Sequence, residues 1–264
     1  MGVGTAKGAK ENTMKLVLVT GASSGVGAAT ARDLALKGAR VILVARSESR
    51  LNTLAADIGD MAIAAPCDAA DSTQVAAMAT GVLTDFGVPD AIIHCAGAGQ
   101  WKTVQDTTPS EAVEMMQAPY FAAFNVTRAF LPQMLERGAG VIISVNSPAC
   151  VVPWPSSVGY AAARAALRGF HEALSQDLVG TGLHSCHVIF GQISSEYFDN
   201  NPGVAEQIPA LSKTIPIITP AFCGSVLAKL VDKPRLSSIH PWILRTHIAF
   251  GVVFPRTARW LVRF

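Results

Sequence analysis

Charged residues and cysteines are both scarce in this chain, and each shortage excludes some classes of protein. Only 15% of the 264 residues are charged and half are apolar, so the chain can bury a large core as a single α/β domain. The five cysteines are widely separated and show no Cys-x-x-Cys spacing, which argues against a disulfide framework and against a metal site such as zinc. This usage fits a reducing compartment.

Long hydrophobic runs are also missing. Residues Met1–Thr13 are rich in Gly and Lys and contain no apolar segment, so we expect a flexible leader rather than a signal peptide, and a cytoplasmic protein. The formal net charge of +2 is too small to indicate a nucleic-acid partner.

The basic residues are concentrated near the C-terminus. From Lys229 to Phe264 there are seven Lys or Arg but one acid, Asp232, in a strongly apolar sequence. Its longest uncharged stretch, Thr246–Pro255, is far shorter than the ~20 residues that span a bilayer. We expect residues 236–264 to be an extension that acts as a lid, a subunit contact or an interfacial membrane anchor. Residues that interrupt a single amphipathic helix favour packing or a lid over membrane contact: Pro241, Gly251 and Pro255.

Apolar runs of strand length alternate with amphipathic segments of helix length. The strand candidates are apolar almost throughout, as is typical of parallel strands buried on both faces: Leu16–Thr20, Val41–Ala45, Ala91–Cys95, Val141–Val145, His187–Phe190 and, more weakly, Met61–Cys67. The helix candidates are Gly25–Lys37, Ser47–Ile58, Asp71–Phe86, Pro109–Arg137, Val158–Leu178 and Pro220–Val231. The alternation predicts a doubly wound parallel sheet with helices on both faces, formed by residues 14–235, with ligands at the carboxyl ends of the strands.

A glycine-rich turn follows the first predicted strand. The pattern Thr20-Gly21-x-x-x-Gly25-x-Gly27 ends that strand and opens the first predicted helix. Backbone N–H groups and the positive end of the helix dipole can hold a pyrophosphate there. We therefore predict that a dinucleotide binds to this turn, through Gly21, Ser23, Ser24, Gly25, Val26 and Gly27. The alternative is a tight turn without a ligand.

The residues that end the second and third strands indicate which dinucleotide binds. An NAD site needs a carboxylate after the second strand, whereas an NADP site needs a cation for the 2′-phosphate. Arg46 follows Ala45 and no acid stands there, so we prefer NADP(H) over NAD(H). Arg46 could instead cap a solvated loop. Asp68, with Ala69 beside it, either accepts a hydrogen bond from the adenine amino group or caps the next helix.

The second half of the chain supplies candidates for catalysis. Ser147 ends the fifth predicted strand, Tyr160 lies 13 residues later in a helix, and Arg164 follows one turn beyond on the same face. A phenol is a poor acid–base catalyst near neutral pH, and a cation beside it favours the ionised form. Tyr160 would protonate a carbonyl oxygen held by Ser147. Each residue alone has an ordinary structural explanation, but together they predict a catalytic site.

From Lys15 to about Val231 the sequence resembles the short-chain dehydrogenase/reductase family. The similarity is carried by TGASSGVG, CDAAD, the Ala96-Gly97 pair, TRAFLP, Ser147 and the helix of Tyr160. It implies a Rossmann-like sheet of about seven strands, a nicotinamide cofactor whose ribose lies near Ala96 and Gly97, and hydride transfer to or from carbon that bears oxygen. It also implies homodimers or homotetramers, packed through the helices predicted at 109–137 and 158–178.

Several positions depart from the family pattern. His94-Cys95 replaces two Asn, and His94 is better explained as a structural histidine than as a new base. Pro119 stands near the position of the Asn that completes the catalytic tetrad, and we expect it to break the helix and free the carbonyl of Met115. Arg164 replaces a Lys that holds the ribose and passes protons to Tyr. Arg keeps the charge and the ribose contact, but it is effectively never deprotonated.

The region after the sixth strand, residues 191–219, takes the place of the family's substrate-binding loop. Within it, Ser195 could contact the carboxamide of the cofactor, and Ile193 its nicotinamide through the backbone. Aromatic residues near the expected cleft predict a mainly hydrophobic substrate with a carbonyl or an alcohol: Trp101, Trp154, Tyr197 and Phe198. These aromatic residues could instead be core or subunit contacts.

Together these features favour an NADP(H)-dependent oxidoreductase that reduces a ketone or aldehyde of a hydrophobic substrate, or oxidises the alcohol. The first alternative is a non-redox dehydratase, isomerase or cyclase on the same scaffold. The second is a cofactor-binding homologue without catalysis.

Overall fold

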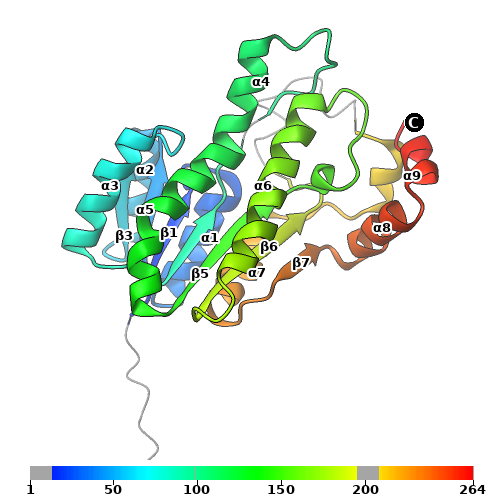
Figure 1. The fold of residues 1–264 in the computed structure, drawn as a ribbon. Coiled ribbons are helices and arrows are strands. Elements are labelled where there is room, and N and C mark those ends of the chain that lie inside the picture. The colour runs from blue at the N-terminus through cyan, green and yellow to red at the C-terminus, as the bar shows by residue number, and fades with distance from the viewer. Residues whose placement is uncertain (1–13, 98, 195–207, 264) are drawn as a thin grey trace, which may run out of the picture.

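The computed structural model of the chain describes residues 14–97, 99–194 and 208–263. Within them, one seven-stranded parallel sheet has the order β3-β2-β1-β4-β5-β6-β7 (Figure 1). Its strands are β1 Leu16–Thr20, β2 Arg40–Ala45, β3 Ala62–Pro66, β4 Ala91–His94, β5 Gly140–Asn146, β6 Leu183–Phe190 and β7 Ser237–His240. The helices are α1 Gly25–Leu36, α2 Glu48–Ile58, α3 Ser72–Asp85, α4 Pro109–Met116, α5 Ala122–Arg137, α6 Val158–Asp177, α7 Pro220–Asp232, α8 Trp242–Val253 and α9 Pro255–Leu261. The predicted doubly wound Rossmann-like sheet is confirmed.

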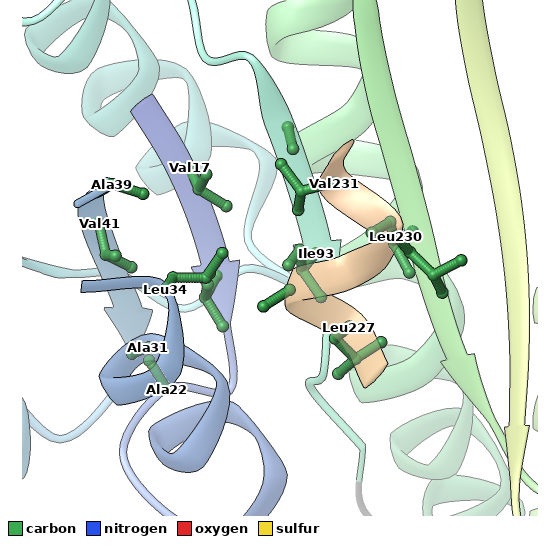
Figure 2. Close-up of a cluster of buried hydrophobic side chains, with 14 of the residues drawn as sticks. Val17, Ala22, Ala31, Leu34, Ala39, Val41, Ile93, Leu227, Leu230 and Val231 are labelled. Atoms are coloured by element: carbon green, nitrogen blue, oxygen red, sulfur yellow. The ribbon is translucent and has the colours of Figure 1, made fainter. Parts of the chain in front are cut away.

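Each central strand buries both of its faces, because its side chains alternate between two helical layers. Val17 and Val19 of β1 pack into the layer of α1, α2 and α7, whereas Leu16 and Leu18 pack into the layer of α3, α5 and α6. Figure 2 shows the first layer, in which Leu34 of α1 and the side chains of α7 converge on the strands. This two-sided burial explains why the strands appear in the sequence as continuous apolar runs.

The strand β7 lies beyond the end of the domain predicted at residue 235. It pairs in parallel with β6, with His187 opposite Ser237 and Phe190 opposite His240. The sheet therefore extends further along the chain than the predicted boundary. This short edge strand, Ser-Ser-Ile-His, is only partly buried and lacks an apolar run.

The helix that contains Pro119 does not break, contrary to the prediction. Between α4 and α5 the chain forms a π-helical turn, Gln117–Phe121, and the backbone N–H of Ala122 donates to the carbonyl of Gln117. Figure 1 shows α4 and α5 as one continuous rod. The wider turn accommodates the proline ring, whose missing N–H would leave a gap in a regular helix.

The C-terminal extension packs one face against the domain. Leu244 and Ile248 of α8 form a buried cluster with Cys150 and Ile189. A Cβ atom on Gly251 would lie 2.5 Å from Cγ2 of Val152, so a larger residue at this position would have to displace α8 or the Val152 side chain. Among the described residues, no helix is long and apolar enough to cross a membrane.

Candidate active site

A cleft of about 1020 Å³ opens at the carboxyl ends of the strands. The predicted dinucleotide-site residues that the structure describes all line it: Gly21, Ser23, Ser24, Gly25, Val26, Gly27, Arg46, Asp68, Ala69, Ala96, Gly97 and Ile193. The predicted catalytic residues and two predicted substrate contacts line the same cleft: Ser147, Tyr160, Arg164, Trp101 and Trp154. Three further predicted contacts, Ser195, Tyr197 and Phe198, lie outside the described residues. The fold thus gathers residues from both halves of the chain around one cavity.

The glycine-rich turn needs its glycines for close backbone approach. Gly21 has a φ of +66°, and a Cβ atom there would lie 2.7 Å from the backbone nitrogen of Ala96. A Cβ atom on Gly27 would lie 2.1 Å from the carbonyl oxygen of Gly21. Such contacts exclude any side chain. The turn, the start of α1 and the segment after β4 are therefore packed backbone against backbone.

The start of α1 is suited to an anion. Ser24, the N-cap residue of α1, makes no side-chain hydrogen bond to the helix, and the first turn carries no acid. By contrast, Asp71, Thr108 and Thr219 cap α3, α4 and α7 through their side chains. The first N–H groups of α1 lie at the cleft with no side-chain cap, where a phosphate can accept their hydrogen bonds. The residues present therefore fit a dinucleotide phosphate.

Arg46 is joined at the cleft by Arg50, a residue that sequence reasoning missed. Both line the cleft after β2, and Arg50 stands four residues later, in the first turn of α2. Arg46 precedes Ser47, the N-cap residue of α2, so the two arginines do not share a helical face; the signal available in the sequence was a second cation shortly after the strand. Two guanidinium groups thus border this end of the cleft.

Asp71, not Asp68, caps the helix after β3. Oδ1 of Asp71 accepts from the backbone N–H groups of Thr73 at 2.8 Å and Gln74 at 3.2 Å. These hydrogen bonds hold the pKa of Asp71 below its ordinary value. Asp68 instead lines the cleft, and its Oδ1 accepts from the backbone N–H of Ala70 at 3.0 Å. Asp68 therefore caps the short turn before α3 and not α3 itself, and its contact with adenine stays a prediction.

Tyr160 and Arg164 are in contact at the cleft and largely buried, with exposed fractions of 7% and 9%. The central guanidinium carbon of Arg164 lies 5.1 Å from the centroid of the Tyr160 ring. One terminal nitrogen of this guanidinium donates to the carbonyl of Val145 at 3.3 Å. A Cβ atom on Gly97 would lie 2.5 Å from the other terminal nitrogen. The cation is therefore held between the ends of β4 and β5, beside the phenol.

No carboxylate balances this cation within the described residues. None of their ion pairs, taken at up to 4.0 Å, involves Arg164, and its Nε is buried without a hydrogen-bond partner. A buried guanidinium without an anion is costly in free energy. Its position facing the cleft favours an anionic or strongly polar ligand there.

Asn146 links the catalytic segments, and sequence reasoning missed it. Its Oδ1 accepts from the backbone N–H of Ser147 at 2.8 Å, and its Nδ2 donates to the carbonyl of Arg164 at 3.0 Å. Nδ2 also lies 2.9 Å from Nε2 of His187, whose ring stacks on His171. Burial lowers the pKa of His187 to about 4, so near neutral pH its ring is uncharged and can accept this hydrogen bond. The amide fixes β5, β6 and α6 relative to one another.

Two tryptophans enclose the phenol of Tyr160. The ring centroids of Trp101 and Trp154 lie 4.8 Å apart, and each lies about 6 Å from the Tyr160 ring, at 6.0 and 6.2 Å. Beneath them, a Cβ atom on Gly99 would lie 2.4 Å from the Tyr160 ring. The structure therefore brings both predicted substrate contacts to the predicted proton donor.

His94 and Cys95 do not supply a base or a nucleophile. Nε2 of His94 lies 2.9 Å from Oγ1 of Thr127, and burial lowers the pKa of the imidazole to about 3. Burial also raises the pKa of the Cys95 thiol to about 12, and the nearby Cys223 adds to this effect. Both groups are neutral near pH 7. His94 has the structural position that the sequence favoured.

The fold and the cleft define a dinucleotide-binding α/β protein with a Tyr-centred site. Over residues 15–202 the chain matches the short chain dehydrogenase family, and it belongs to this family of oxidoreductases. A short chain dehydrogenase of Pseudocercospora fijiensis is 34% identical over 206 residues, which are 75% of this chain. The matched segments span between 58% and 67% of the first three curated relatives.

Solved structures of this family have the same fold. A short-chain dehydrogenase from Streptomyces avermitilis is 26% identical, with a TM-score of 0.81 over 93% of this chain and 95% of that one. A metagenomic short-chain oxidoreductase, solved in complex with NADP, is 28% identical, with a TM-score of 0.72 over 85% of this chain and 95% of that one.

Proposed function

We propose that this protein is an NADP(H)-dependent oxidoreductase that reduces a ketone or aldehyde of a hydrophobic substrate, or oxidises the corresponding alcohol. The observation that carries this proposal is the buried contact of Tyr160 with Arg164 at a cleft that also holds the glycine-rich turn. A bound nicotinamide would supply or take up the hydride.

Binding of the substrate oxygen, proton exchange and charge stabilisation would be carried out by separate residues of the chain. Ser147 would hold the substrate oxygen and Tyr160 would exchange a proton with it, because both line the cleft. Asn146 would keep Ser147 and the helix of Tyr160 in register. Arg164 would stabilise negative charge and contact the ribose without carrying protons.

The preference for NADP(H) rests on Arg46 and Arg50 at the end of β2, where a 2′-phosphate would lie. The NADP complex of the related metagenomic enzyme supports it. Titration of the protein with NADPH and NADH should show tighter binding of NADPH. Arg46→Ala should weaken NADPH binding at least about tenfold with little effect on NADH. Arg32→Ala, at an exposed arginine of α1 outside the main cleft, is the matched control.

A hydrophobic substrate is expected because Trp101 and Trp154 lie against Tyr160. The test is oxidation of NADPH, followed by nicotinamide absorbance, against a panel of apolar ketones, aldehydes and enones. Tyr160→Phe should abolish turnover while NADPH binding is kept. Tyr120→Phe is the control, because Tyr120 belongs to an aromatic cluster with Phe121 and Phe124 and does not line the cleft. Turnover by Tyr160→Phe would contradict the proposed role.

The burial of Arg164 also favours a second candidate, a non-redox dehydratase, isomerase or cyclase on the same scaffold. A cation that cannot relay protons suits electrostatic stabilisation of a charged intermediate at least as well as repeated proton delivery. Product formation without any change in nicotinamide absorbance would favour this candidate over the reductase.

We also propose a homodimer or homotetramer packed through α4, α5 and α6. These helices and the π-helical turn between α4 and α5 present exposed apolar side chains, among them Phe121, Phe124 and Val158. Light scattering of the purified chain should give at least twice the monomer mass, and Phe124→Glu should reduce it. A monomer in the wild type would contradict this proposal.

A further inference from the structure

The exposed faces of α8 and α9 form an apolar surface, here called the C-terminal surface. Six large apolar side chains on it are between 37% and 74% exposed: Trp242, Phe250, Val252, Val253, Phe254 and Trp260. Isolated exposed apolar residues are ordinary, but a gathering of this size on two consecutive helices marks an interaction site.

This surface belongs to a helix that is already anchored. Leu244 and Ile248 bury the opposite face of α8 in the domain, and Gly251 lies against Val152. The only charged residue of α8 is Arg245. A helix that is apolar around most of its circumference normally has a partner on each side. The domain covers one side of α8 and leaves the other exposed.

The charge on the C-terminal segment that carries this surface has a single sign. All 19 acidic residues of the chain lie at or before Asp232. The residues after it include six cations: Lys233, Arg235, Arg245, Arg256, Arg259 and Arg263. Exposed aromatic side chains interspersed with arginines and free of acids suit the headgroup region of a bilayer that carries anionic lipids. This complementarity favours a lipid surface over a second copy of the chain, which would bring the same positive charge.

The helix α8, whose outer side carries the C-terminal surface, borders the cleft with its anchored side. β7 delivers the chain to the carboxyl edge of the sheet, and α8 and α9 follow beyond its arrowhead (Figure 1). Nε2 of His247 in α8 lies 3.1 Å from Oγ1 of Thr214. The next residue, Ile215, both lines the cleft and packs against the cluster that anchors α8. An apolar substrate dissolved in lipid would therefore be close to the cleft.

We propose that the C-terminal surface docks on a membrane face that carries anionic phospholipids. The aromatic side chains enter the headgroup region, and the arginines contact lipid phosphates. The docking itself does not depend on the proposed reaction; only the delivery of an apolar substrate rests on it.

The test is co-sedimentation of the full chain with vesicles of phosphatidylcholine alone and with added phosphatidylserine. We expect binding to the anionic vesicles, at least about tenfold weaker binding to the neutral ones, and loss of binding at high salt. Arg256→Glu with Arg259→Glu, and separately Phe254→Glu, should each reduce binding to anionic vesicles at least about tenfold. Leu36→Glu, at a residue of α1 that is 87% exposed, and Arg128→Glu, at an exposed residue of α5, are the matched controls.

A second measurement uses conservative substitutions, so that misfolding of a variant is not mistaken for loss of vesicle binding. Trp242→Phe and Trp260→Phe each leave one tryptophan on the surface, and brominated lipids should quench its fluorescence when the protein binds. Absence of vesicle binding, or equal binding by the surface and control variants, would overturn the proposal. So would a wild-type oligomer that Phe254→Glu dissociates, because a second copy would then cover the surface. Vesicle binding without reductase activity would contradict the proposed function and leave the docking intact.

Discussion

Replacement of Arg164 with Met should stabilise the unliganded protein while it weakens the binding of a nicotinamide cofactor. Met has a similar unbranched shape and fills the space beside Gly97 without charge. Among the described residues, the buried guanidinium makes one hydrogen bond, to the carbonyl of Val145, and one cation–π contact, with Tyr160. Within the described residues it has no carboxylate partner, so its desolvation is only partly compensated.

The magnitude follows from opposing contributions. Loss of the charged hydrogen bond costs about 1.5–3 kcal/mol, and loss of the cation–π contact about 0.5–2 kcal/mol. The desolvation penalty of a buried cation is several kcal/mol, and replacement of buried ions by apolar residues is often stabilising by about 1–4 kcal/mol. We expect a net gain of about 1–2 kcal/mol, or a rise in Tm of about 2–6 °C for a chain of this size.

The assay is thermal and urea unfolding of the wild type, Arg164→Met and Arg164→Lys, each with and without saturating NADPH. Without cofactor, the Met variant should have the highest Tm. With NADPH, the wild type and the Lys variant should gain more than the Met variant, because the stability that a ligand adds rises with the logarithm of its concentration relative to Kd. A lower Tm of unliganded Arg164→Met would mean that the cation is needed for the fold. An equal gain from NADPH in all three proteins would mean that Arg164 does not contact the cofactor.

Three further predictions follow from buried groups and close contacts. Burial lowers the pKa of His94 in the folded protein to about 3, from its ordinary value of 6.5. The unfolded chain therefore takes up the proton first, and the free energy of unfolding should fall by up to about 1.4 kcal/mol per pH unit as the pH drops from 6.5 towards 3. His94→Asn should reduce this slope in urea unfolding, and an unchanged slope would refute the argument. Asn146→Ala removes three hydrogen bonds and should lower the free energy of unfolding by about 2–3 kcal/mol. It should also reduce turnover. Full activity would show that the amide does not position the site. Gly27→Ala places a Cβ atom 2.1 Å from the carbonyl oxygen of Gly21 and should lower the free energy of unfolding by at least about 2 kcal/mol in thermal unfolding. At Gly81 in α3 an added Cβ atom would meet nothing within 4 Å, so Gly81→Ala should raise it by about 0.5–1 kcal/mol. Similar effects from both variants would contradict the packing argument.

Most strands and helices could be predicted because their burial determines the pattern of apolar residues within each segment of the sequence. β1 has the predicted bounds, Leu16–Thr20, since a parallel strand buried on both faces is a continuous apolar run. β6 begins four residues before the predicted start at His187, because its first residues mix apolar with polar side chains. β7 has no local signature: Ser237–His240 is a strand only because β6 offers an unpaired edge.

Site residues could be predicted where they belong to a short sequence motif. Residues that meet only in the folded structure could not. Gly21, Tyr160 and Arg164 follow from spacing within one turn or one helix. Asn146 reaches α6 and β6 only through the packed structure, so nothing in its local sequence reveals the link. The π-helical turn at Pro119 depends on the packing of a whole helix, which residue preference alone does not specify.

The strand order has a consequence for the way the chain is made. β1 lies inside the sheet, with β2 and β3 on one side and β4 to β7 on the other. Each strand therefore pairs with one that the ribosome has already released, and the sheet can grow outward during synthesis. The growing edge stays open until Ser237–His240 emerges and covers β6. Chains that end before β7 would leave the N–H and C=O groups of β6 unpaired at an exposed apolar edge, and they should aggregate rather than fold.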